Sequence, residues 1–212
     1  MLQIQKEKEV QKLRRHSDVP PDLTLSPIKL GHGAELPVKR VLEVQQELAA
    51  RLKEDQAVRK DPSRRGEMGR VNAENGRFLR TLVEEVGWID SRRFGRQTSA
   101  DAVILLQHTM DIPLVSAVLP MIEQDFKAAG PGAELFAIVF DGLRIDLGQK
   151  QRFGTQVGED LKGEPLVLPL ESIEQVEAYR KELGLPPLKD YLAKASQVLY
   201  DGKPIRMPQP DE

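Results

Sequence analysis

The chain has 212 residues, the length of one ordinary domain or of one domain with an extension. Its 31 Lys and Arg residues nearly balance 33 Asp and Glu residues, so its net charge of -2 gives no bulk electrostatic reason to expect nucleic acid or an acidic membrane as a partner. The absence of cysteine excludes disulfides, thiolate metal sites, iron–sulfur clusters and cysteine nucleophiles.

The N-terminal segment mixes lysine and glutamate with apolar residues and lacks the unbroken apolar stretch of a signal peptide. The longest apolar runs, 102–106 and 135–140, are much shorter than the roughly 20 residues that cross a bilayer. We therefore expect a cytoplasmic protein without a membrane partner.

Proline and glycine mark the expected domain boundaries. Four prolines and two glycines between residues 17 and 37 indicate an extended linker, so residues 1–35 are predicted to be an N-terminal extension. Residues 36–200 are predicted to form a single mainly helical domain, and the proline-rich segment 201–212 is predicted to be a flexible tail.

Within the domain, apolar residues recur mostly at helical spacing. Gly87 is a good C-cap, Ser99 a plausible N-cap, and Pro113 suits a first helical turn, whereas Pro120 should kink its helix. Segment 88–98 has no regular period and is predicted to be a loop. The predicted helices cover residues 38–60, 71–86, 100–110, 113–130, 133–147, 171–184 and 187–197.

One hairpin signal is convincing. Segments 151–157 and 164–170 flank a glycine-bounded turn region at 158–163. The predicted fold class is therefore mainly α, with about six to seven helices and one late β-hairpin.

Familiar catalytic motifs are absent: the sequence contains no GxGxxG, GxxxxGK[ST], GxSxG, HExxH or EF-hand loop. The basic cluster Arg92, Arg93 and Arg96 lies beside Trp88 in the predicted loop. Such a cluster holds a phosphate through bidentate contacts or consists of solvated loop charges. Both readings remain open from the sequence.

His108 is the histidine best placed for catalysis. On a continuous helix, His108 and Asp111 would share a face, and the carboxylate would fix the imidazole tautomer for general acid–base work. Gln107 would add a hydrogen bond. The alternative is a histidine at a helix end whose ring only packs and caps. A lone histidine with Asp101, Asp111 or Asp141 is a thin basis for a metal site, so no metal and no cofactor are predicted.

Asp141 and Arg144 lie three residues apart in the most apolar predicted helix, where charges need partners. They are an internal ion pair, or Arg144 binds a substrate anion while Asp141 assists. The segment 149–156 concentrates amides, cations and a hydroxyl around a glycine, which is unusual for a plain strand. It suggests a ligand-facing wall formed by Gln151, Arg152, Thr155 and Gln156, or a solvated edge strand.

An ordered set of motifs resembles a bacterial family of uncharacterised domains whose members show Gly-Trp-Pro, Val-Gln-His-Ala-Asp and Tyr-Gly-Thr-Gln elements in this order. The resemblance covers residues 42–191 and implies that the elements belong to one domain. Its elements here are Asp55-Gln56-x-x-Arg59, Asn75 ahead of Gly87-Trp88, Leu106-Gln107-His108-x-x-Asp111, Asp141-x-x-Arg144, Gln151-x-Phe153-Gly154-Thr155-Gln156 and Gly184-Leu185-Pro186-Pro187-Leu188-x-x-Tyr191.

Three positions depart from that pattern. Ile89 stands where the family has proline, Phe153 stands where it has tyrosine, and Asp111 follows His108 by three positions and not by two. The last departure puts the pairing of His108 with Asp111 in doubt, and Phe153 lacks the hydroxyl of a candidate proton donor.

The sequence thus favours a small acid–base enzyme, a hydrolase or lyase without a redox cofactor, that acts on a polar, anionic small molecule. The catalytic candidates are His108, Asp111 and Asp141, and the substrate-binding candidates are Gln107, Arg144, Gln151, Arg152, Thr155, Gln156 and Trp88. The alternative is a non-catalytic ligand-binding or protein-interaction module. A nucleic-acid partner is not expected, and no oligomeric state is predicted.

Overall fold

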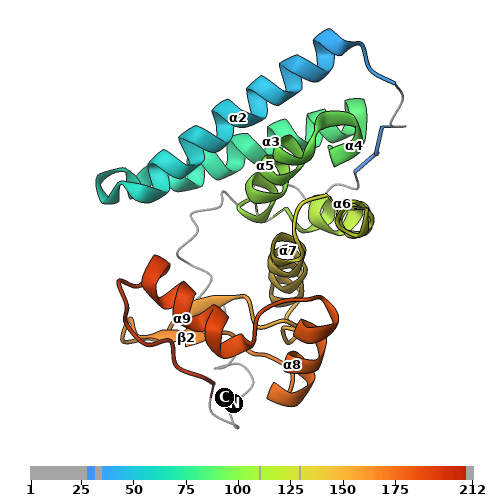
Figure 1. Ribbon diagram of the computed structural model, residues 1–212. Coiled ribbons are helices and arrows are strands. Elements are labelled where there is room, and N and C mark those ends of the chain that lie inside the picture. Colours follow the sequence, from blue (N-terminus) through green and yellow to red (C-terminus); the bar gives the residue numbers. More distant parts are fainter. Residues whose placement is uncertain (1–27, 32–34, 110, 129, 209–212) are drawn as a thin grey trace. The chain divides into compact units, whose positions relative to one another are not determined.

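The computed structural model describes residues 28–31, 35–109, 111–128 and 130–208 (Figure 1). These residues fall into two compact units, and the boundary between the units lies within helix α7, between Val139 and Phe140. We call the described residues up to 139 the helical unit and residues 140–208 the hairpin unit. His16, His32 and most of the predicted N-terminal extension lie outside the described residues.

The helical unit consists of helices joined by short turns. α2 and α3 lie side by side, and α5 packs against both (Figure 1). The predicted helices over 38–60 and 71–86 are confirmed, and Gly87 ends the second of them with a φ of 75°, which favours glycine. The elements are α2 (Val38–Lys60), a 3-10 turn η2 (Pro62–Glu67), α3 (Met68–Val86), α4 (Ser91–Phe94), α5 (Arg96–Gln107), α6 (Ile112–Lys127) and the first part of α7 (Ala133–Asp146).

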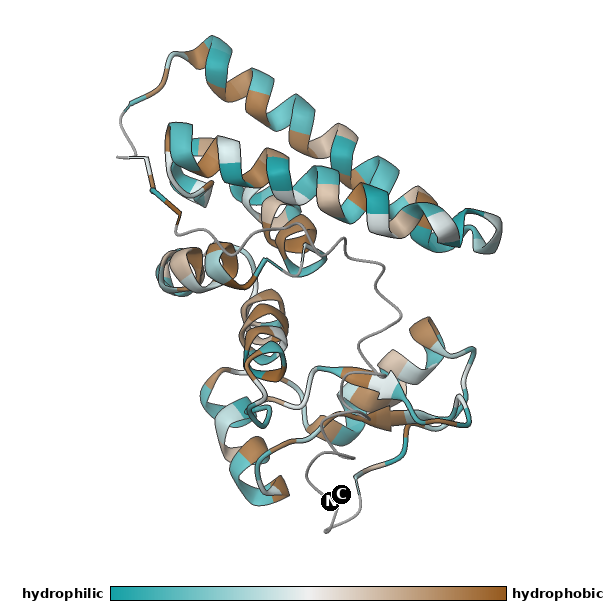
Figure 2. Cartoon of the chain, turned by 180° about the vertical axis from the view of Figure 1, so that it is seen from behind, coloured by the Kyte–Doolittle hydropathy of each residue, from teal (hydrophilic) through white to brown (hydrophobic). Residues whose placement is uncertain are grey.

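Apolar side chains of α2, α3 and α5 form the core of the helical unit. Leu48, Leu79 and Leu105 are fully buried, and complete burial of such a side chain stabilises a fold by about 1.5–3 kcal/mol. Hydrophilic and hydrophobic residues share each of these helices (Figure 2), as expected for helices that bury one side. Each of the three helices also buries polar side chains, such as Asp55 on α2, Asn72 on α3 and Asp101 on α5.

Segment 88–98, predicted to be a loop, contains α4 and the start of α5. The carboxylate of Asp90 accepts a hydrogen bond from the backbone N–H of Arg93 and caps α4. Gly95, with a φ of 84°, separates α4 from α5, which begins at Arg96 and not at Ala100. A helix of four residues is too short to produce a helical period in the sequence.

The hairpin unit combines a small sheet with three helical segments. β1 (Val157–Glu159) and β2 (Pro165–Val167) pair antiparallel, with Val157 opposite Val167. The rest of α7, α8 (Ile173–Glu182) and α9 (Leu188–Leu199) complete the unit. Its core is formed by Val167, Leu170, Val176 and Leu188, with Val157, Leu192 and Ile205 packed against it.

Residues near the C-terminus contribute to this sheet. Val167 donates its backbone N–H to the carbonyl of Arg206, and Arg206 donates to the carbonyl of Pro165. Part of the segment that the sequence predicts to be a flexible tail is therefore held against β2.

The predicted first strand over 151–157 is confirmed only at its two ends, because Gln151 forms an isolated bridge with Leu170 and Val157 begins β1. The backbone N–H groups of Arg152, Phe153 and Thr155 do not bond a neighbouring strand but donate to the carboxylate of Asp141. Residues 152–156 therefore form a loop around that carboxylate, and β1 begins at Val157.

The predicted fold class is confirmed. The described residues contain eight α-helices and one late antiparallel hairpin, and α4 is the helix that the sequence does not predict. Among the helices described, none has both the length and the apolar character that crossing a membrane requires.

Candidate functional site: a buried His–Asp pair

The ten residues predicted to form a site belong to both units. Trp88, Gln107, His108 and Asp111 lie in the helical unit, and the other six lie in the hairpin unit. The geometry of each set decides which of these side chains are available for chemistry.

His108 pairs with Asp55 of α2. The imidazole Nδ1 lies 3.1 Å from the carboxylate of Asp55, whose side chain is 1% exposed, whereas the side chain of His108 is 19% exposed. His108 is the residue directly after α5, so the packing of α5 against α2 brings the two groups together. The geometry matches that of a carboxylate that holds an imidazole in one tautomer.

Further polar groups surround this pair. The guanidinium of Arg59, one turn after Asp55 on α2, donates to both carboxylate oxygens of Asp55 at 3.1–3.2 Å. It also donates to the amide oxygen of Asn72 on α3 at 2.7 Å. On the other side of the ring, the amide nitrogen of Gln107 lies 3.2 Å from His108 Nε2. We call these five residues the His108 cluster.

The electrostatics of the His108 cluster favour a neutral imidazole beside an ionised carboxylate. Burial raises the pKa of Asp55, but hydrogen bonds from His108 and Arg59 outweigh it and hold this pKa at about 2. Burial lowers the pKa of His108 below its usual 6.5, and the charge of Arg59 acts in the same direction against the opposing effect of Asp55. With Nδ1–H donated to Asp55, the lone pair of His108 lies on Nε2, where it accepts from Gln107.

The predicted pairing of His108 with Asp111 is wrong. Asp111 is buried and forms an ion pair with Arg80 of α3, with Nη2 2.7 Å from Oδ1. The same carboxylate caps α6 by accepting from the backbone N–H of Leu114. Because α5 ends at Gln107, His108 and Asp111 do not share a helix face.

In the hairpin unit, Asp141 organises a loop. Its fully buried carboxylate accepts from the backbone N–H groups of Arg152, Phe153 and Thr155 and from the hydroxyl of Thr155, at 2.8–3.2 Å. Burial raises the pKa of Asp141, and these hydrogen bonds oppose the rise. So many donors leave this carboxylate little capacity to take a proton from a substrate.

The predicted ligand-facing wall is mostly engaged within the hairpin unit. The amide of Gln151 donates to the carbonyls of Gln156 and Leu168 and accepts from the N–H of Gln156, so its hydrogen-bonding capacity is used. The amide of Gln156 donates to Thr155 Oγ1 at 3.2 Å. The amides of Gln151 and Gln156 thus have partners within the hairpin unit without requiring a ligand.

The two predicted anion-binding arginines differ. Arg144 forms an ion pair with Glu171 at 3.0 Å and donates to the carbonyl of Lys150. Arg152 lies over the rings of Phe140 and Tyr179, with its carbon Cζ 5.3 and 4.8 Å from the ring centroids, and its buried Nε has no hydrogen-bond acceptor within the described structure. Of the two, Arg152 is the one left without an ion pair among the described residues.

A family model described as a family of unknown function (DUF6624) matches residues 42–202. The chain belongs to this family. The resemblance predicted from the ordered motifs is thereby confirmed for the family. No curated protein and no solved structure matches the chain.

The part of the chain matched by the DUF6624 model contains the His108 cluster, Asp141 and the loop 152–156 around its carboxylate. Asp55 belongs to the first motif element of the resemblance, but the sequence analysis gave it no functional role, although a carboxylate at a core position of α2 is itself a signal. Within the described residues, no group of three or more His, Asp or Glu side chains has the arrangement of a metal site.

Proposed function

We propose that the chain is an enzyme that uses His108 as a general acid or base on a polar, anionic small molecule. The observation that carries the proposal is the contact between His108 Nδ1 and the buried carboxylate of Asp55. This arrangement replaces the pairing with Asp111 that the sequence suggested, and it leaves the role of His108 unchanged.

In the proposed mechanism, the lone pair on His108 Nε2 forms a new N–H bond while an O–H bond of water or a C–H bond of the substrate breaks. The imidazolium that results is stabilised by the negative charge of Asp55, as in other carboxylate–histidine pairs. The proton then returns from Nε2 to the leaving group, so His108 ends each cycle neutral. Hydrolysis and elimination both need these two proton transfers.

Two neighbouring groups support this role. The amide of Gln107 occupies Nε2 in the free protein and has to turn away when a substrate proton approaches, which makes it a positioning residue. Arg59 places a positive charge beside the imidazole, and its side chain is 26% exposed. The guanidinium is paired with Asp55, so only its exposed part is available to a substrate that carries negative charge.

The test is mass spectrometry of a metabolite extract incubated with purified protein. The samples are the wild type, the wild type with EDTA, His108→Gln, Asp55→Asn and the matched control Asp101→Asn. Asp101 is also buried on α5 but bonds Gln97 and lies outside the His108 cluster. The expected result is a metabolite consumed by the wild type and by Asp101→Asn, but consumed at least about 100-fold more slowly by His108→Gln.

Consumption of the metabolite by His108→Gln at the wild-type rate would overturn the proposal. A metabolite that is retained by the protein but never converted would identify the alternative, a ligand-binding module. Circular dichroism of every variant separates loss of chemistry from loss of folding. The EDTA sample shows whether a metal takes part.

A further inference from the structure

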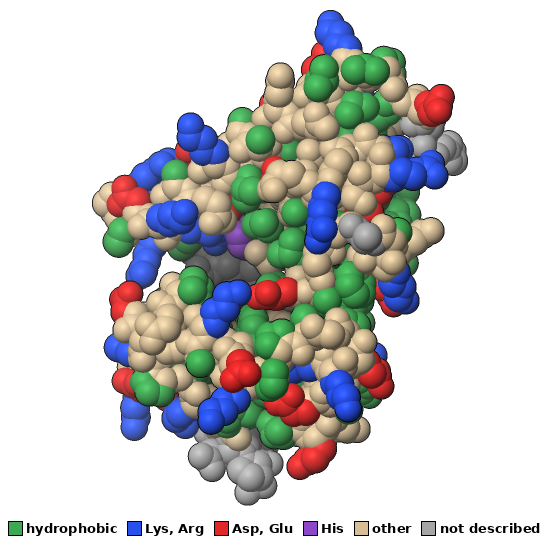
Figure 3. All heavy atoms as spheres, viewed as in Figure 1, with side chains coloured by type: hydrophobic (Ala, Val, Ile, Leu, Met, Phe, Trp, Pro, Cys, Tyr) green, Lys and Arg blue, Asp and Glu red, His purple; other side chains and the backbone are tan. Residues whose placement is uncertain are grey.

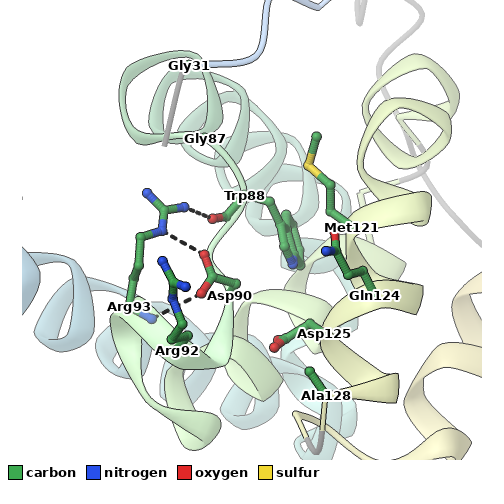
Figure 4. Close-up of a pocket in the computed structure, with 10 residues that line it drawn as sticks. All are labelled: Gly31, Gly87, Trp88, Asp90, Arg92, Arg93, Met121, Gln124, Asp125 and Ala128. Atoms are coloured by element: carbon green, nitrogen blue, oxygen red, sulfur yellow. Dashed lines mark hydrogen bonds and ion pairs between the residues drawn. The ribbon is translucent and has the colours of Figure 1, made fainter. Parts of the chain in front are cut away.

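We infer that a pocket beside Trp88 in the helical unit is a binding site for a small organic carboxylate. The pocket has a volume of about 570 Å³, which lies within the range of small-molecule sites. None of the residues that line it belongs to the His108 cluster, so the inference does not depend on the proposed function. The lining residues are Gly31, Gly87, Trp88, Asp90, Arg92, Arg93, Met121, Gln124, Asp125 and Ala128 (Figure 4).

One wall is made rigid by hydrogen bonds within the segment that follows α3. Arg93 donates to the carboxylate of Asp90 and to the backbone carbonyl of Trp88 (Figure 4), and it also donates to the backbone carbonyl of Val86. Gly31 packs against the end of α3, where a Cβ atom would come within 2.8 Å of backbone atoms of Glu84, Glu85 and Gly87. The charges of Asp90 and Arg93 therefore compensate each other and hold the wall in place.

The opposite wall is part of α6. Asp125 accepts hydrogen bonds from the backbone N–H and the hydroxyl of Ser91 and from the hydroxyl of Ser99, the last at 2.7 Å. This buried carboxylate is thus already supplied with donors. Met121 and Ala128 add apolar surface, and Gln124 adds an exposed amide.

Two donors of the pocket have no acceptor among the described residues. The indole Nε1 of Trp88 is buried without a hydrogen bond, and the whole residue is only 3% exposed. In Figure 4 the nitrogen edge of this indole faces the side of the pocket formed by Gln124 and Asp125. Arg92 is exposed at the pocket and forms no ion pair or hydrogen bond within the described part of the chain, unlike the neighbouring Arg93.

These two donors favour a ligand that carries negatively charged oxygen acceptors. A buried N–H without an acceptor is unfavourable, and a carboxylate oxygen is an acceptor that satisfies it. The negative charge of the same ligand pairs with Arg92, whose guanidinium matches a carboxylate in a bidentate geometry. A cation would find no unpaired carboxylate among the described lining residues, because Asp90 pairs with Arg93 and Asp125 is bonded to serines.

Trp88 is the single tryptophan of the chain, so its fluorescence reports on this pocket alone. We would titrate the full-length protein with acetate, succinate and citrate, with inorganic phosphate, and with succinamide as the uncharged analogue of succinate. Isothermal titration calorimetry provides a second readout. Arg92→Gln is compared with the matched control Arg96→Gln, since Arg96 is also exposed but does not line the pocket.

A saturable change is expected with at least one carboxylate, with roughly tenfold weaker binding to Arg92→Gln and unchanged binding to Arg96→Gln. Trp88→Phe, which keeps an aromatic ring but loses the N–H, is expected to bind more weakly in calorimetry. Succinamide is expected to give no saturable signal.

Three results would overturn the inference. The first is that no carboxylate gives a saturable signal by either method at millimolar concentration. The second is that Arg92→Gln and Arg96→Gln bind equally well. The third is that phosphate or succinamide binds as tightly as the best carboxylate, which would show that the pocket does not select this chemistry.

Discussion

Asp55 and Asp141 are both buried carboxylates, but their surroundings make them opposites. Asp55, in the helical unit, is bonded by the side chains of His108 and Arg59, which can carry charge, and its pKa is held at about 2. Asp141, in the hairpin unit, is bonded by backbone N–H groups and a hydroxyl, and burial raises its pKa. Burial of a carboxylate therefore does not identify a catalytic group; the nature of its partners does.

The partners also differ in what they can do. His108 has a second nitrogen that can exchange a proton, and its side chain is 19% exposed. The backbone N–H groups around Asp141 do not act as general acids or bases near neutral pH. Their hydrogen bonds to Asp141 fix the path of the chain from Arg152 to Thr155. We therefore expect Asp55 to matter most for chemistry and Asp141 most for stability.

The largest loss of stability is expected from Asp141→Ala. The change leaves the buried N–H groups of the loop without an acceptor, which should lower the free energy of unfolding by about 3 kcal/mol or more. Thr155→Val removes the hydroxyl that donates to Asp141 and accepts from Gln156 but leaves the backbone donors in place, so its cost should be smaller, about 1 kcal/mol. Urea unfolding followed by circular dichroism measures both.

The exposed Glu182, at the end of α8, offers a matched control, because Glu182→Gln should leave the unfolding midpoint unchanged. A loss of less than about 1 kcal/mol for Asp141→Ala would show that the loop does not depend on this carboxylate.

A second prediction concerns the stability of the fold at acidic pH. The folded-state pKa of Asp55, about 2, lies below the ordinary 3.8, so its ionised form stabilises the fold above pH 3.8. The difference corresponds to roughly 2 kcal/mol, which is lost as the pH falls from 3.8 through 2. Asp55→Asn should lack this part of the acid sensitivity.

The measurement is the free energy of unfolding between pH 5 and pH 2 for the wild type and Asp55→Asn. Asp101→Asn serves as the control, since Asp101 is buried on a neighbouring helix. Parallel curves for the wild type and Asp55→Asn would contradict the strong pairing of Asp55 with His108 and Arg59.

The smallest effect on the stability of the fold is expected from the titration of His108. The pKa of His108 in the folded protein lies below 6.5, its ordinary value in an unfolded chain. As the pH falls below about 7, the imidazole is therefore protonated in the unfolded chain before it is protonated in the folded protein. The free energy of unfolding declines over this range until His108 is protonated in the folded protein as well. His108→Gln should remove this slope. Nitrogen-15 NMR of the imidazole should show the neutral Nδ1–H form at pH 7.

Asp55→Asn should further lower the pKa of His108, because the negative charge that favours the imidazolium is removed. Asp111→Asn should leave that pKa unchanged, since Asp111 bonds Arg80 and not His108. A pKa above 6.5 in the wild type, or an equal effect of the two variants, would contradict the structure of the His108 cluster.

The sequence predicted the elements with a strong local signal. The apolar period over Val38–Lys60, the C-cap at Gly87 and the glycine-bounded turn before β2 each depend on residues close together in the chain. α4 escaped prediction, because its capping residue Asp90 and the break at Gly95 act over only four helical residues.

The candidate site was only partly predictable, because side chains that form a hydrogen bond can lie far apart in the sequence. His108 could be selected as the histidine on an apolar helix, but its partner Asp55 lies 53 residues away and meets it only because α2 packs against α5. Local spacing instead suggested Asp111, which the end of α5 directs to Arg80. Likewise, the predicted strand over 151–157 is interrupted because Asp141, on α7, binds the backbone N–H groups of Arg152 and Thr155.

The sequence by itself determined the mainly helical class, the late hairpin, the absence of thiol chemistry and the family. These properties follow from composition, from the period of apolar residues and from motifs read along the chain. Only the tertiary structure decided that His108 pairs with Asp55, that Asp141 holds a loop and that Trp88 borders a pocket. Hydrogen bonds and burial depend on which helices pack together, and residues distant in sequence become neighbours only when those helices meet.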